Sequence, residues 1–307
     1  MNTSLLVTRR GFVKTTTTAA VAAASGFSEI ETLASAVQIP HTKTSSHGLI
    51  DTNITLGRWP FRQLPLDETP ALLAKLRQRG VTQAWAGSFE GLFHKDLSAA
   101  NARLAEACQR QGRGLLVPFG SVNPSLPGWE DDVHRCAEVH KMPGIRLHPS
   151  YHGYKLDDPA FAQLLLLAGE RRLIIQIVAD MEDERTQHPL ARAPHADFKP
   201  LLAKAKALRG ARIILLNWFR SINPPLVEQL ATSGACFDIA TLEGVGGVAN
   251  LIEQIPASQV VFGSHTPLFY FESALLKLKE SLLTTGQEHA VRFGNARRLL
   301  SLTQAKG

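Results

Sequence analysis

The sequence predicts a single (β/α)8 barrel of the TIM type, and three observations support this prediction. Eight short apolar runs recur along the chain, each run ends in polar or aromatic residues, and successive runs begin 24 to 39 residues apart. Each interval accommodates one strand, one helix and two loops. The predicted strands begin at Leu49, Val81, Leu115, Gly144, Leu173, Arg212, Cys236 and Val260. Because barrels of this kind carry their chemistry on the loops that follow the strands, the candidate site lies just past each run.

Apolar spacing predicts a helix after each of these strands. The expected helices cover residues 67–79, 97–111, 129–140, 159–171, 198–208, 225–232, 248–253 and 271–283. Glycines are common just past helix ends, and Gly80, Gly112, Gly210 and Gly234 are expected to end four of them. A last helix from about Gln287 is expected to seal the bottom or the side of the barrel.

The first 40 residues have the composition of a targeting segment. Thr8-Arg9-Arg10-Gly11-Phe12-Val13-Lys14 precedes a short Ala/Thr-rich stretch and resembles a twin-arginine export signal. Ala34-Ser35-Ala36 supplies a small-residue cleavage site, and the apolar stretch is too short and too rich in threonine to span a bilayer. We therefore expect a leader over residues 1–40, a barrel domain over residues 41–307, and an exported, periplasmic protein.

Charge and cysteine content narrow the range of partners. The formal net charge is +6, of which +5 remains after the leader, and no run of five like charges occurs. A basic patch for nucleic acid is therefore not indicated, and a small-molecule substrate is expected. The three cysteines form no CxxC pair and no even disulfide framework, so we interpret them as buried apolar residues. A homo-oligomer is left open.

The predicted strand ends are more polar than ordinary turns. The loop after the fifth strand is the densest, with six charged or amide residues and one histidine from Asp180 to His188. Polar groups that converge on a barrel mouth are typical of a ligand site. The candidate substrate-binding residues are Asp51, Asn53, Arg58, Tyr151, His152, Glu182, Asn217 and Glu243.

Four segments together resemble the amidohydrolase-related (amidohydrolase 2) branch of the amidohydrolase superfamily. They are Leu49-Ile50-Asp51-Thr52-Asn53, Gly144-Ile145-Arg146-Leu147-His148-Pro149, Phe262-Gly263-Ser264-His265-Thr266-Pro267 and Gly294-Asn295-Ala296-Arg297-Arg298-Leu299-Leu300. The resemblance spans the chain after the leader. It implies a divalent metal bound by His-x-His at strand one, by histidines at strands five and six, and by an aspartate at strand eight.

The metal-binding positions implied by the resemblance are all substituted in this chain. They read Asn53, Thr55, Val178, Asn217 and His265. Amide and hydroxyl groups are poor zinc ligands, and valine provides no ligand atom. We therefore expect no metal at the usual positions and no cofactor there.

The first hypothesis is a hydrolase that acts without metal on a small carboxylated or polyhydroxylated compound such as a lactone, ester or amide. His265 would act as the general base, because imidazole titrates near neutrality. Arg146 would hold a carboxylate or polarise a carbonyl, with His148 as a neighbouring donor or acid. Arg146 could equally form an ion pair inside the barrel with Asp238 or Asp51.

Three alternatives remain open. A relocated zinc or manganese ion could use Glu182, Asp183, His188 and His265. The spacing of His148 and His152 would suit one face of a helix, but Pro149 and Gly153 favour a loop there. Decarboxylation or hydro-lyase chemistry needs no attacking water. A catalytically silent barrel could bind a ligand without turnover. Fold-level likeness does not choose among these alternatives.

Overall fold

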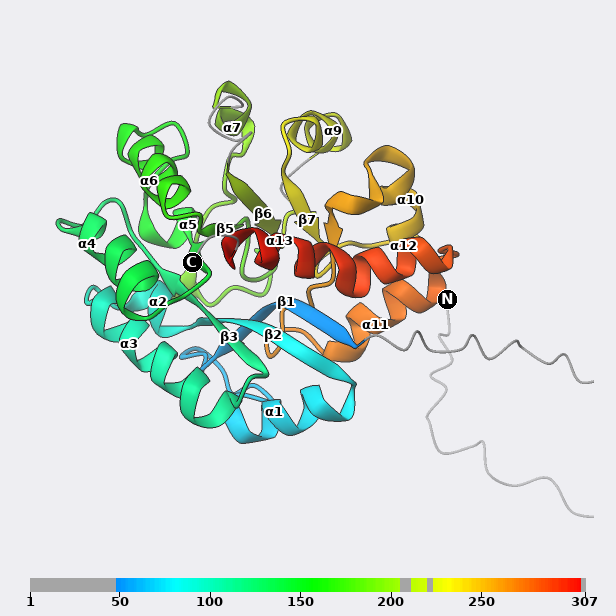
Figure 1. Cartoon of the computed structure of the whole chain (residues 1–307), viewed down its shortest axis with the longest axis horizontal. Helices are drawn as coiled ribbons and strands as arrows, with labels where there is room; N and C mark the ends of the chain where they lie inside the picture. Colours follow the sequence, from blue (N-terminus) through cyan, green and yellow to red (C-terminus); the bar gives the residue numbers. More distant parts are fainter. Residues whose placement is uncertain (1–47, 205–210, 220–222, 305–307) are drawn as a thin grey trace, which may run out of the picture. The chain divides into compact units, whose positions relative to one another are not determined.

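Eight parallel strands form one closed ring in the computed structural model, which describes residues 48–204, 211–219 and 223–304 (Figure 1). The strands follow chain order: β1 Leu49–Leu56, β2 Val81–Ser88, β3 Leu116–Ser121, β4 Gly144–Leu147, β5 Ile174–Val178, β6 Arg212–Leu216, β7 Cys236–Asp238 and β8 Val260–Val261. The predicted strand starts are thus confirmed to within one residue. The prediction of a leader over residues 1–40 lies outside the described residues.

The helices surround the strands (Figure 1). They are α1 Thr69–Gln78, α2 Glu90–Phe93, α3 Leu97–Ala107, α4 Trp129–His134, α5 Pro149–His152, α6 Pro159–Glu170, α7 Lys199–Ala203, α9 Pro224–Thr232, α10 Gly247–Gln254, α11 Phe271–Glu280, α12 Thr285–His289 and α13 Asn295–Gln304. None of the helices in these described stretches combines the length and the apolar composition needed to cross a membrane.

Backbone hydrogen bonds between the last and first strands close the ring. Thr52 N–H donates to the Phe262 carbonyl at 2.9 Å, His265 N–H to the Asn53 carbonyl at 2.8 Å, and Thr55 N–H to the Thr266 carbonyl at 2.9 Å. Because β8 itself is only two residues long, these bonds extend the pairing past it. They bring Asn53 and His265 into adjacent positions at the carboxyl ends of the strands.

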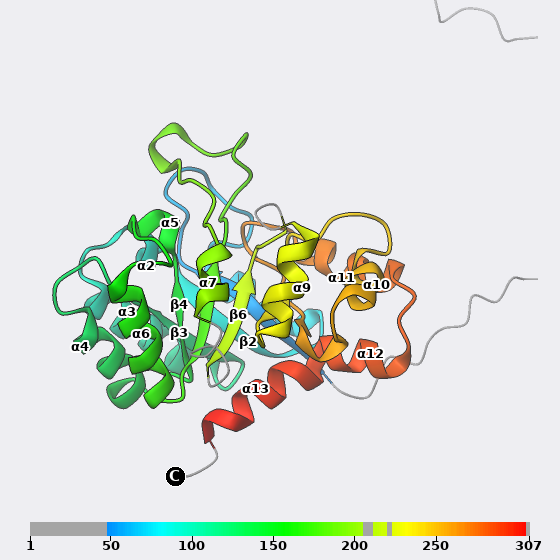
Figure 2. The ribbon, with the colours of Figure 1, turned by 90° about the horizontal axis from the view of Figure 1, so that it is seen from above.

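Apolar side chains fill two separate regions. Inside the barrel, Trp85 stacks on Phe119 at 4.9 Å between ring centroids, and Leu299 of α13 contributes to the same cluster from one end. Outside, the buried leucines of α1 and α6 pack against the strands. Asn295 fixes α13 by donating to the Ala257 and Val260 carbonyls at 2.7 Å. The predicted last helix therefore seals the end of the barrel opposite the long loops that follow β1 and β5 (Figure 2).

Arg146 of β4 lies buried on the inside of the barrel. Its guanidinium donates to Gln176 Oε1 and the Ile54 carbonyl at 2.7 Å and to the Trp85 carbonyl at 3.1 Å. Burial lowers the pKa of Arg146 to about 10, so it remains cationic at neutral pH. Gly87 makes room for it, because a Cβ there would lie 2.7 Å from Arg146 Nη1. Its hydrogen bonds therefore go to backbone carbonyls and amide oxygen, and neither Asp238 nor Asp51 pairs with it directly.

Two local predictions differ from the structure. The segment after β4 was expected to be a loop, but it forms the single helical turn α5, in which His152 N–H donates to the His148 carbonyl at 2.9 Å. Pro149 occupies the first helical position, where its missing N–H costs nothing, so it starts the turn instead of preventing it. Gly112 does not end its helix; the chain turns at Arg113, with φ of 42°. Gly80 and Gly234 do take positive φ, and Gly210 lies outside the described residues.

Replacing Arg146 tests its structural role directly. We expect Arg146→Met to lower the free energy of unfolding by about 3 kcal/mol or more, because three buried oxygens lose their charged donor. Urea denaturation without any ligand measures this change. Arg110→Met is the control, since Arg110 is 77% exposed and pairs only with Glu106 on its own helix. An equally small effect for both variants would show that Arg146 is not needed for the fold.

Candidate active site at the carboxyl ends of the strands

Two asparagines and an aspartate form a closed hydrogen-bonded layer at the strand ends. Asn53 Nδ2 donates to Asn217 Oδ1 at 2.8 Å and to Asp238 Oδ2 at 2.7 Å. Asn217 N–H donates to the second oxygen of Asp238 at 2.9 Å, and Asn217 Nδ2 donates to the Asp180 carbonyl at 2.8 Å. All three side chains are buried. The layer thus connects the ends of β1, β5, β6 and β7 through the side-chain amides of Asn53 and Asn217.

A second carboxylate fixes β8 to β1. Asp51 accepts from the backbone N–H of Asn53 and of Ser264 at 3.0 Å, and from the Ser264 hydroxyl at 2.6 Å. Burial raises the pKa of Asp51 to about 7 and that of Asp238 to about 6. Asp51 therefore titrates near neutral pH, whereas Asp238 is mostly ionised there.

His265 has both ring nitrogens engaged. Its Nε2 lies 2.7 Å from the Met181 carbonyl, and Asn217 Nδ2 lies 3.3 Å from Nδ1 and 3.4 Å from Nε2. These partners fit a neutral imidazole that donates from Nε2 and accepts at Nδ1. Burial lowers the pKa of His265 to about 4, which agrees with the neutral form. As placed, His265 has no free nitrogen for an incoming water or substrate.

His265 and Asn217 both have left-handed backbone conformations, with φ of 58° and 55°. Such values are strained for residues other than glycine and cluster at functional sites. The strain turns both side chains inward from the ends of their strands, toward one another. The conformation therefore supports a functional role for this layer.

Two long loops cover the layer. The β1–α1 loop and the β5–α7 loop rise side by side above the strand ends (Figure 2). Arg62 of the first loop forms an ion pair with Glu182 of the second, and Phe61 stacks on His188 at 5.0 Å between ring centroids. Only Arg62 of the ion pair is accessible, with 44% of its side chain exposed against 3% for Glu182.

Aromatic rings and unpaired polar atoms lie under these loops. Trp59 contacts Phe61, Phe89 and Phe93 at 5.2–5.6 Å between centroids, and Phe93 contacts Tyr151 at 5.7 Å. Trp59 Nε1, His148 Nδ1 and Tyr151 Oη are buried and have no hydrogen-bond partner. Buried polar atoms are nearly always paired, so these three positions are suited to a ligand. We call this region the mouth cluster: Trp59, Phe61, Phe93, His148 and Tyr151.

Comparison with known proteins identifies the family. A family model described as amidohydrolase matches residues 50–209, which is more than half of the chain. The chain belongs to the amidohydrolase 2 family. The resemblance predicted from four sequence segments is thereby confirmed. No curated protein sequence matches the chain.

Solved structures with the same fold include several decarboxylases. The 2,6-dihydroxybenzoate decarboxylase from Rhizobium has a TM-score of 0.60 at 13% identity, over 82% of this chain and 99% of that one. A dihydroxybenzoic acid decarboxylase from Polaromonas, with bound manganese and 2-nitroresorcinol, has a TM-score of 0.64 at 13% identity, over 84% and 98%. The 5-carboxyvanillate decarboxylase from Novosphingobium aromaticivorans, with manganese and a nitrobenzoic acid, has 0.62 at 15%, over 83% and 96%. At these identities the likeness establishes the fold alone.

The donor set of this chain does not fit a divalent metal at the usual positions. The amide nitrogen of Asn53 faces the oxygens of Asn217 and Asp238, and His265 Nε2 faces a carbonyl. Val178 packs in the apolar cluster inside the barrel. Metal ligation needs several free nitrogen or oxygen lone pairs directed at one point, and here the layer already uses them.

The residues considered for a relocated metal face different partners. Glu182 pairs with Arg62, Asp183 with Arg185, and His188 Nδ1 accepts from Leu190 N–H at 3.2 Å. His265 remains in the strand-end layer. Across residues 48–204, 211–219 and 223–304, no three His, Cys, Asp or Glu side chains form a group that could hold a metal ion.

The structure gathers some of the predicted substrate-binding residues and separates others. Asn53 and Asn217 belong to the buried layer, and Asp51 lies next to it. Tyr151 and Glu182 lie at the mouth. His152 Nε2 lies 2.9 Å from the Gly91 carbonyl, beside His148 at 5.8 Å between rings. Arg58 pairs with Glu68 in an exposed ion pair, away from the mouth.

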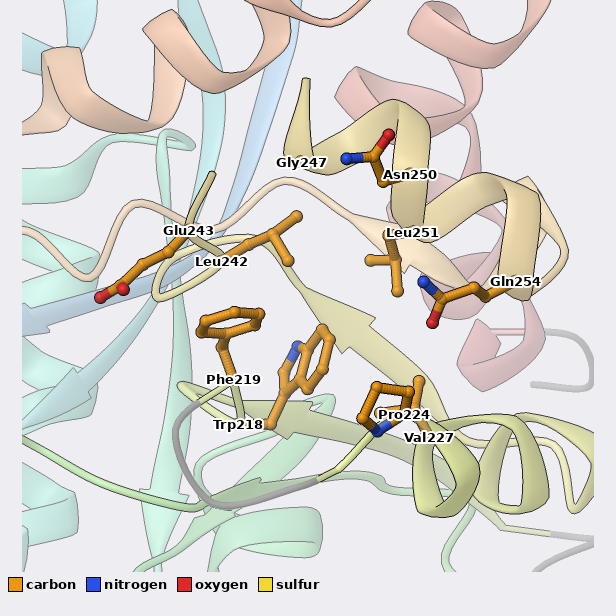
Figure 3. A pocket seen from close by; sticks show the side chains of 10 residues that line it. All are labelled: Trp218, Phe219, Pro224, Val227, Leu242, Glu243, Gly247, Asn250, Leu251 and Gln254. Carbon is orange, nitrogen blue, oxygen red and sulfur yellow. The ribbon is translucent and has the colours of Figure 1, made fainter. Parts of the chain in front are cut away.

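Glu243 lies outside the barrel mouth, at the edge of a cavity of about 350 Å³ between α9 and α10. Trp218, Phe219 and Leu251 supply its apolar walls, and the Glu243 carboxylate points away from the two aromatic rings (Figure 3). Trp218 Nε1 donates to the Asp238 carbonyl at 2.6 Å, so its polar edge belongs to the strand-end layer. The cavity is therefore separate from the mouth cluster.

Sequence reasoning missed the importance of Trp59 and Arg62 relative to Arg58. All three occur in Gly57-Arg58-Trp59-Pro60-Phe61-Arg62, and only the loop conformation decides which arginine reaches Glu182. Gln176 was also missed; its polar side chain within an apolar strand was a usable signal, because it shares the barrel interior with Arg146 at 2.7 Å.

A glycine substitution tests how tightly the layer is packed. A Cβ on Gly263 would lie 2.5 Å from Asp238 Oδ2 and 3.0 Å from Asn53 Cβ. We expect Gly263→Ala to lower the free energy of unfolding by about 1–3 kcal/mol in denaturant titrations. Gly286→Ala is the control, because nothing lies within 4 Å of its added carbon. A Gly263→Ala protein as stable as the parent would mean that the layer is loose.

The pH dependence of stability tests the state of His265. Its pKa is lowered to about 4 from 6.5, so its contribution to stability is present above pH 6.5 and is lost as the pH falls through 4. We expect the stability difference between the protein and His265→Gln to shrink over this window by about 3 kcal/mol or less. Asp51 and Asp238 titrate in both proteins, so the difference isolates His265. A difference independent of pH, measured by urea denaturation at several pH values, would contradict the neutral, buried imidazole.

Proposed function

We propose that this member of the amidohydrolase 2 family is an enzyme that acts on a small planar carboxylated compound at the mouth cluster, without a metal at the usual positions. Decarboxylation is the reaction that the site supports best. The bond from the ring carbon to the carboxylate breaks, CO2 leaves, and a proton replaces it on the carbon. This reaction needs a substrate-shaped dry site and a proton, but no attacking water.

The observation that carries the proposal is the closed layer of Asn53, Asn217 and Asp238, together with His265, which contacts Asn217. A hydrolase must place and activate a water near the reacting carbonyl. In this layer, every one of the polar groups named above already has a protein partner, and His265 is covered by the Met181 carbonyl at 2.7 Å. The layer therefore favours chemistry that takes place above it and does not consume water.

The mouth cluster supplies the features that such a substrate requires. Its aromatic rings suit a flat, conjugated molecule, and its unpaired polar atoms on Trp59, His148 and Tyr151 suit oxygen substituents. Burial holds the pKa of His148 well below its ordinary value, so the ring is neutral. With Nδ1 unpaired, we assign His148 to a proton relay: the neutral ring takes the proton of a substrate ring hydroxyl at Nδ1 and passes it to the reacting carbon as CO2 leaves, so that the product departs as a phenolate.

The structural neighbours support the same choice by analogy only. Three of them are named as decarboxylases of hydroxylated or methoxylated benzoates, and two contain manganese. The residues of this chain do not reproduce a manganese ligand set at the strand ends, so no step is assigned to a metal. The analogy favours decarboxylation over other lyase reactions.

Hydrolysis of a lactone or ester is the second candidate, favoured by one observation. The neutral His265 lies at the end of β8, where an imidazole could take a proton from water if the Met181 carbonyl moved away. In that case the β5–α7 loop would have to open before each turnover. A barrel that binds its ligand without turnover is the third candidate.

We also propose that the chain is exported by the twin-arginine route. The support is the sequence from Thr8 to Lys14 and the Ala34-Ser35-Ala36 site. A fusion of residues 1–40 to a reporter that is active only after export tests this, with Arg9→Lys and Arg10→Lys together as the control. Export that is insensitive to the paired substitution would refute the assignment.

The decisive assay combines metal content with turnover. We expect well under one zinc or manganese per chain in protein prepared without added metal or chelator, and CO2 release from 2,6-dihydroxybenzoate or 5-carboxyvanillate that persists in EDTA. His148→Asn should lower the rate by about 100-fold or more, because it removes the proton-transfer group. His134→Asn, a half-exposed histidine on α4, is the matched control.

Other outcomes of this assay select a different function. One metal per chain with activity lost in EDTA would overturn the metal-free proposal. Turnover of lactones or esters, but not of aromatic acids, would replace decarboxylation by hydrolysis. A ligand that raises the melting temperature without being consumed would indicate a silent binding barrel.

A further inference from the structure

Two consecutive residues of the β5–α7 loop occupy the mouth of the barrel. The Met181 carbonyl accepts from His265 Nε2 at 2.7 Å, and the Glu182 carboxylate forms the ion pair with Arg62. One peptide segment thus provides a carbonyl oxygen to an imidazole and a carboxylate to a guanidinium. Both partners belong to other parts of the barrel, β8 and the β1–α1 loop.

The burial of this ion pair is uneven. The Glu182 side chain is 3% exposed, whereas the Arg62 side chain is 44% exposed. A carboxylate loses much of its hydration when it enters such a site, and a guanidinium partner offsets that cost. Nothing in the packing of Arg62 requires that the carboxylate come from the protein itself. A carboxylate of a bound molecule would satisfy the same guanidinium with the same geometry.

The surroundings of Glu182 are only partly satisfied. Tyr151 lies close enough that Glu182 and Asp180 help raise the pKa of its hydroxyl, yet Tyr151 Oη has no hydrogen-bond partner. Trp59 Nε1 and His148 Nδ1 are also unpaired in the mouth cluster. An unpaired buried polar atom costs about 1–3 kcal/mol. The closed arrangement therefore leaves free energy to be gained by a molecule that can pair with these atoms.

The loop that carries Glu182 is braced internally. Gln187 Nε2 donates to the Glu182 carbonyl at 3.2 Å, and Gln187 Oε1 accepts from Ala193 N–H at 3.2 Å. These bonds hold the segment together as one unit, while its contacts to the other loop are the Arg62 ion pair and the stacking of His188 on Phe61. The Glu182 side chain could thus leave Arg62 while the backbone of the segment keeps its bonds to Asn217 and His265.

We propose that the Glu182 carboxylate is an internal stand-in for the ligand and that Arg62 is the residue that recognises the ligand carboxylate. This inference rests on the location of the site in the proposed function. The ligand displaces the Glu182 side chain from Arg62, while the Met181 carbonyl keeps its hydrogen bond to His265. The ligand therefore carries a carboxylate attached to a flat ring that fits the mouth cluster. The ligand carboxylate and Glu182 compete for Arg62. Acids therefore bind more tightly than neutral analogues, which cannot replace Glu182 at the guanidinium.

Binding of benzoate, salicylate and benzamide tests this inference without any turnover. Isothermal titration would be carried out on the full chain and on Glu182→Gln, which keeps the shape of the side chain but removes its charge. We expect Glu182→Gln to bind benzoate at least about tenfold more tightly, because the competing carboxylate is gone, and salicylate more tightly than benzoate. The affinity for benzamide should be the same in Glu182→Gln as in the parent protein. Glu184→Gln is the matched control, an exposed carboxylate two residues away.

Arg62→Gln provides the opposite test. It should weaken benzoate and salicylate binding at least about tenfold relative to the parent, whereas Arg192→Gln, an exposed arginine of the β5–α7 loop, should not. This variant also keeps the inference testable if Glu182→Gln does not fold. Equal benzoate affinity in the parent, Glu182→Gln and Arg62→Gln would overturn the inference, as would an absence of benzoate binding in Glu182→Gln.

The two proposals can fail separately. Tighter benzoate binding by Glu182→Gln, with no CO2 release from any aromatic acid, would retain the internal stand-in and remove decarboxylation. CO2 release that is unaffected by Glu182→Gln and Arg62→Gln, with unchanged benzoate affinity, would retain the reaction and remove the internal stand-in.

Discussion

The arrangement of the site depends on one buried amide group, the side chain of Asn53. Its two N–H bonds join Asn217 and Asp238 at 2.8 and 2.7 Å, and so link three strands that would otherwise end in unpaired polar groups. A neutral donor can bring an amide oxygen and a carboxylate together without the desolvation cost of a buried cation. This bond pair gives the strand ends a fixed geometry, and it also removes the free lone pairs that a metal would need.

Below this layer, Arg146 performs a comparable task for the backbone. The register between β1 and β2 is irregular, and the Ile54 and Trp85 carbonyls of these strands accept from Arg146. A buried carbonyl without a hydrogen-bond donor costs free energy. The guanidinium has enough donors to satisfy several of them together with Gln176, and Gly87 leaves the space that it needs. An arginine that would suggest ligand recognition in an isolated motif is therefore committed to the fold. The residue that can meet a ligand is Arg62, which lies on a loop and is partly exposed.

The mouth differs from these two layers in how well its polar groups are paired. The named polar groups inside the barrel are paired, whereas Trp59, His148 and Tyr151 retain unpaired atoms beneath two loops that contact each other through the Arg62–Glu182 ion pair and a ring stack. A ligand that forms hydrogen bonds with these atoms would gain binding free energy, because the protein leaves them unpaired. Both proposals rest on this. The left-handed backbone of Asn217 and His265 belongs to the same boundary between the rigid layers and the mouth.

The sequence by itself determined the barrel, the strand starts, the polar strand ends and the family, because alternation of apolar and polar residues and the positions of glycine and proline act locally. It also located Asn53, Asn217 and His265 at neighbouring strand ends. Only the tertiary structure decided which polar groups pair, since Asn53 and Asp238 are 185 residues apart and no local pattern specifies their contact. For the same reason, Arg146 was expected to meet a carboxylate or a ligand and instead meets carbonyls, and Arg62 could not be distinguished from Arg58. The choice of partners depends on distances across the barrel and on desolvation, and both exist only once the chain has folded.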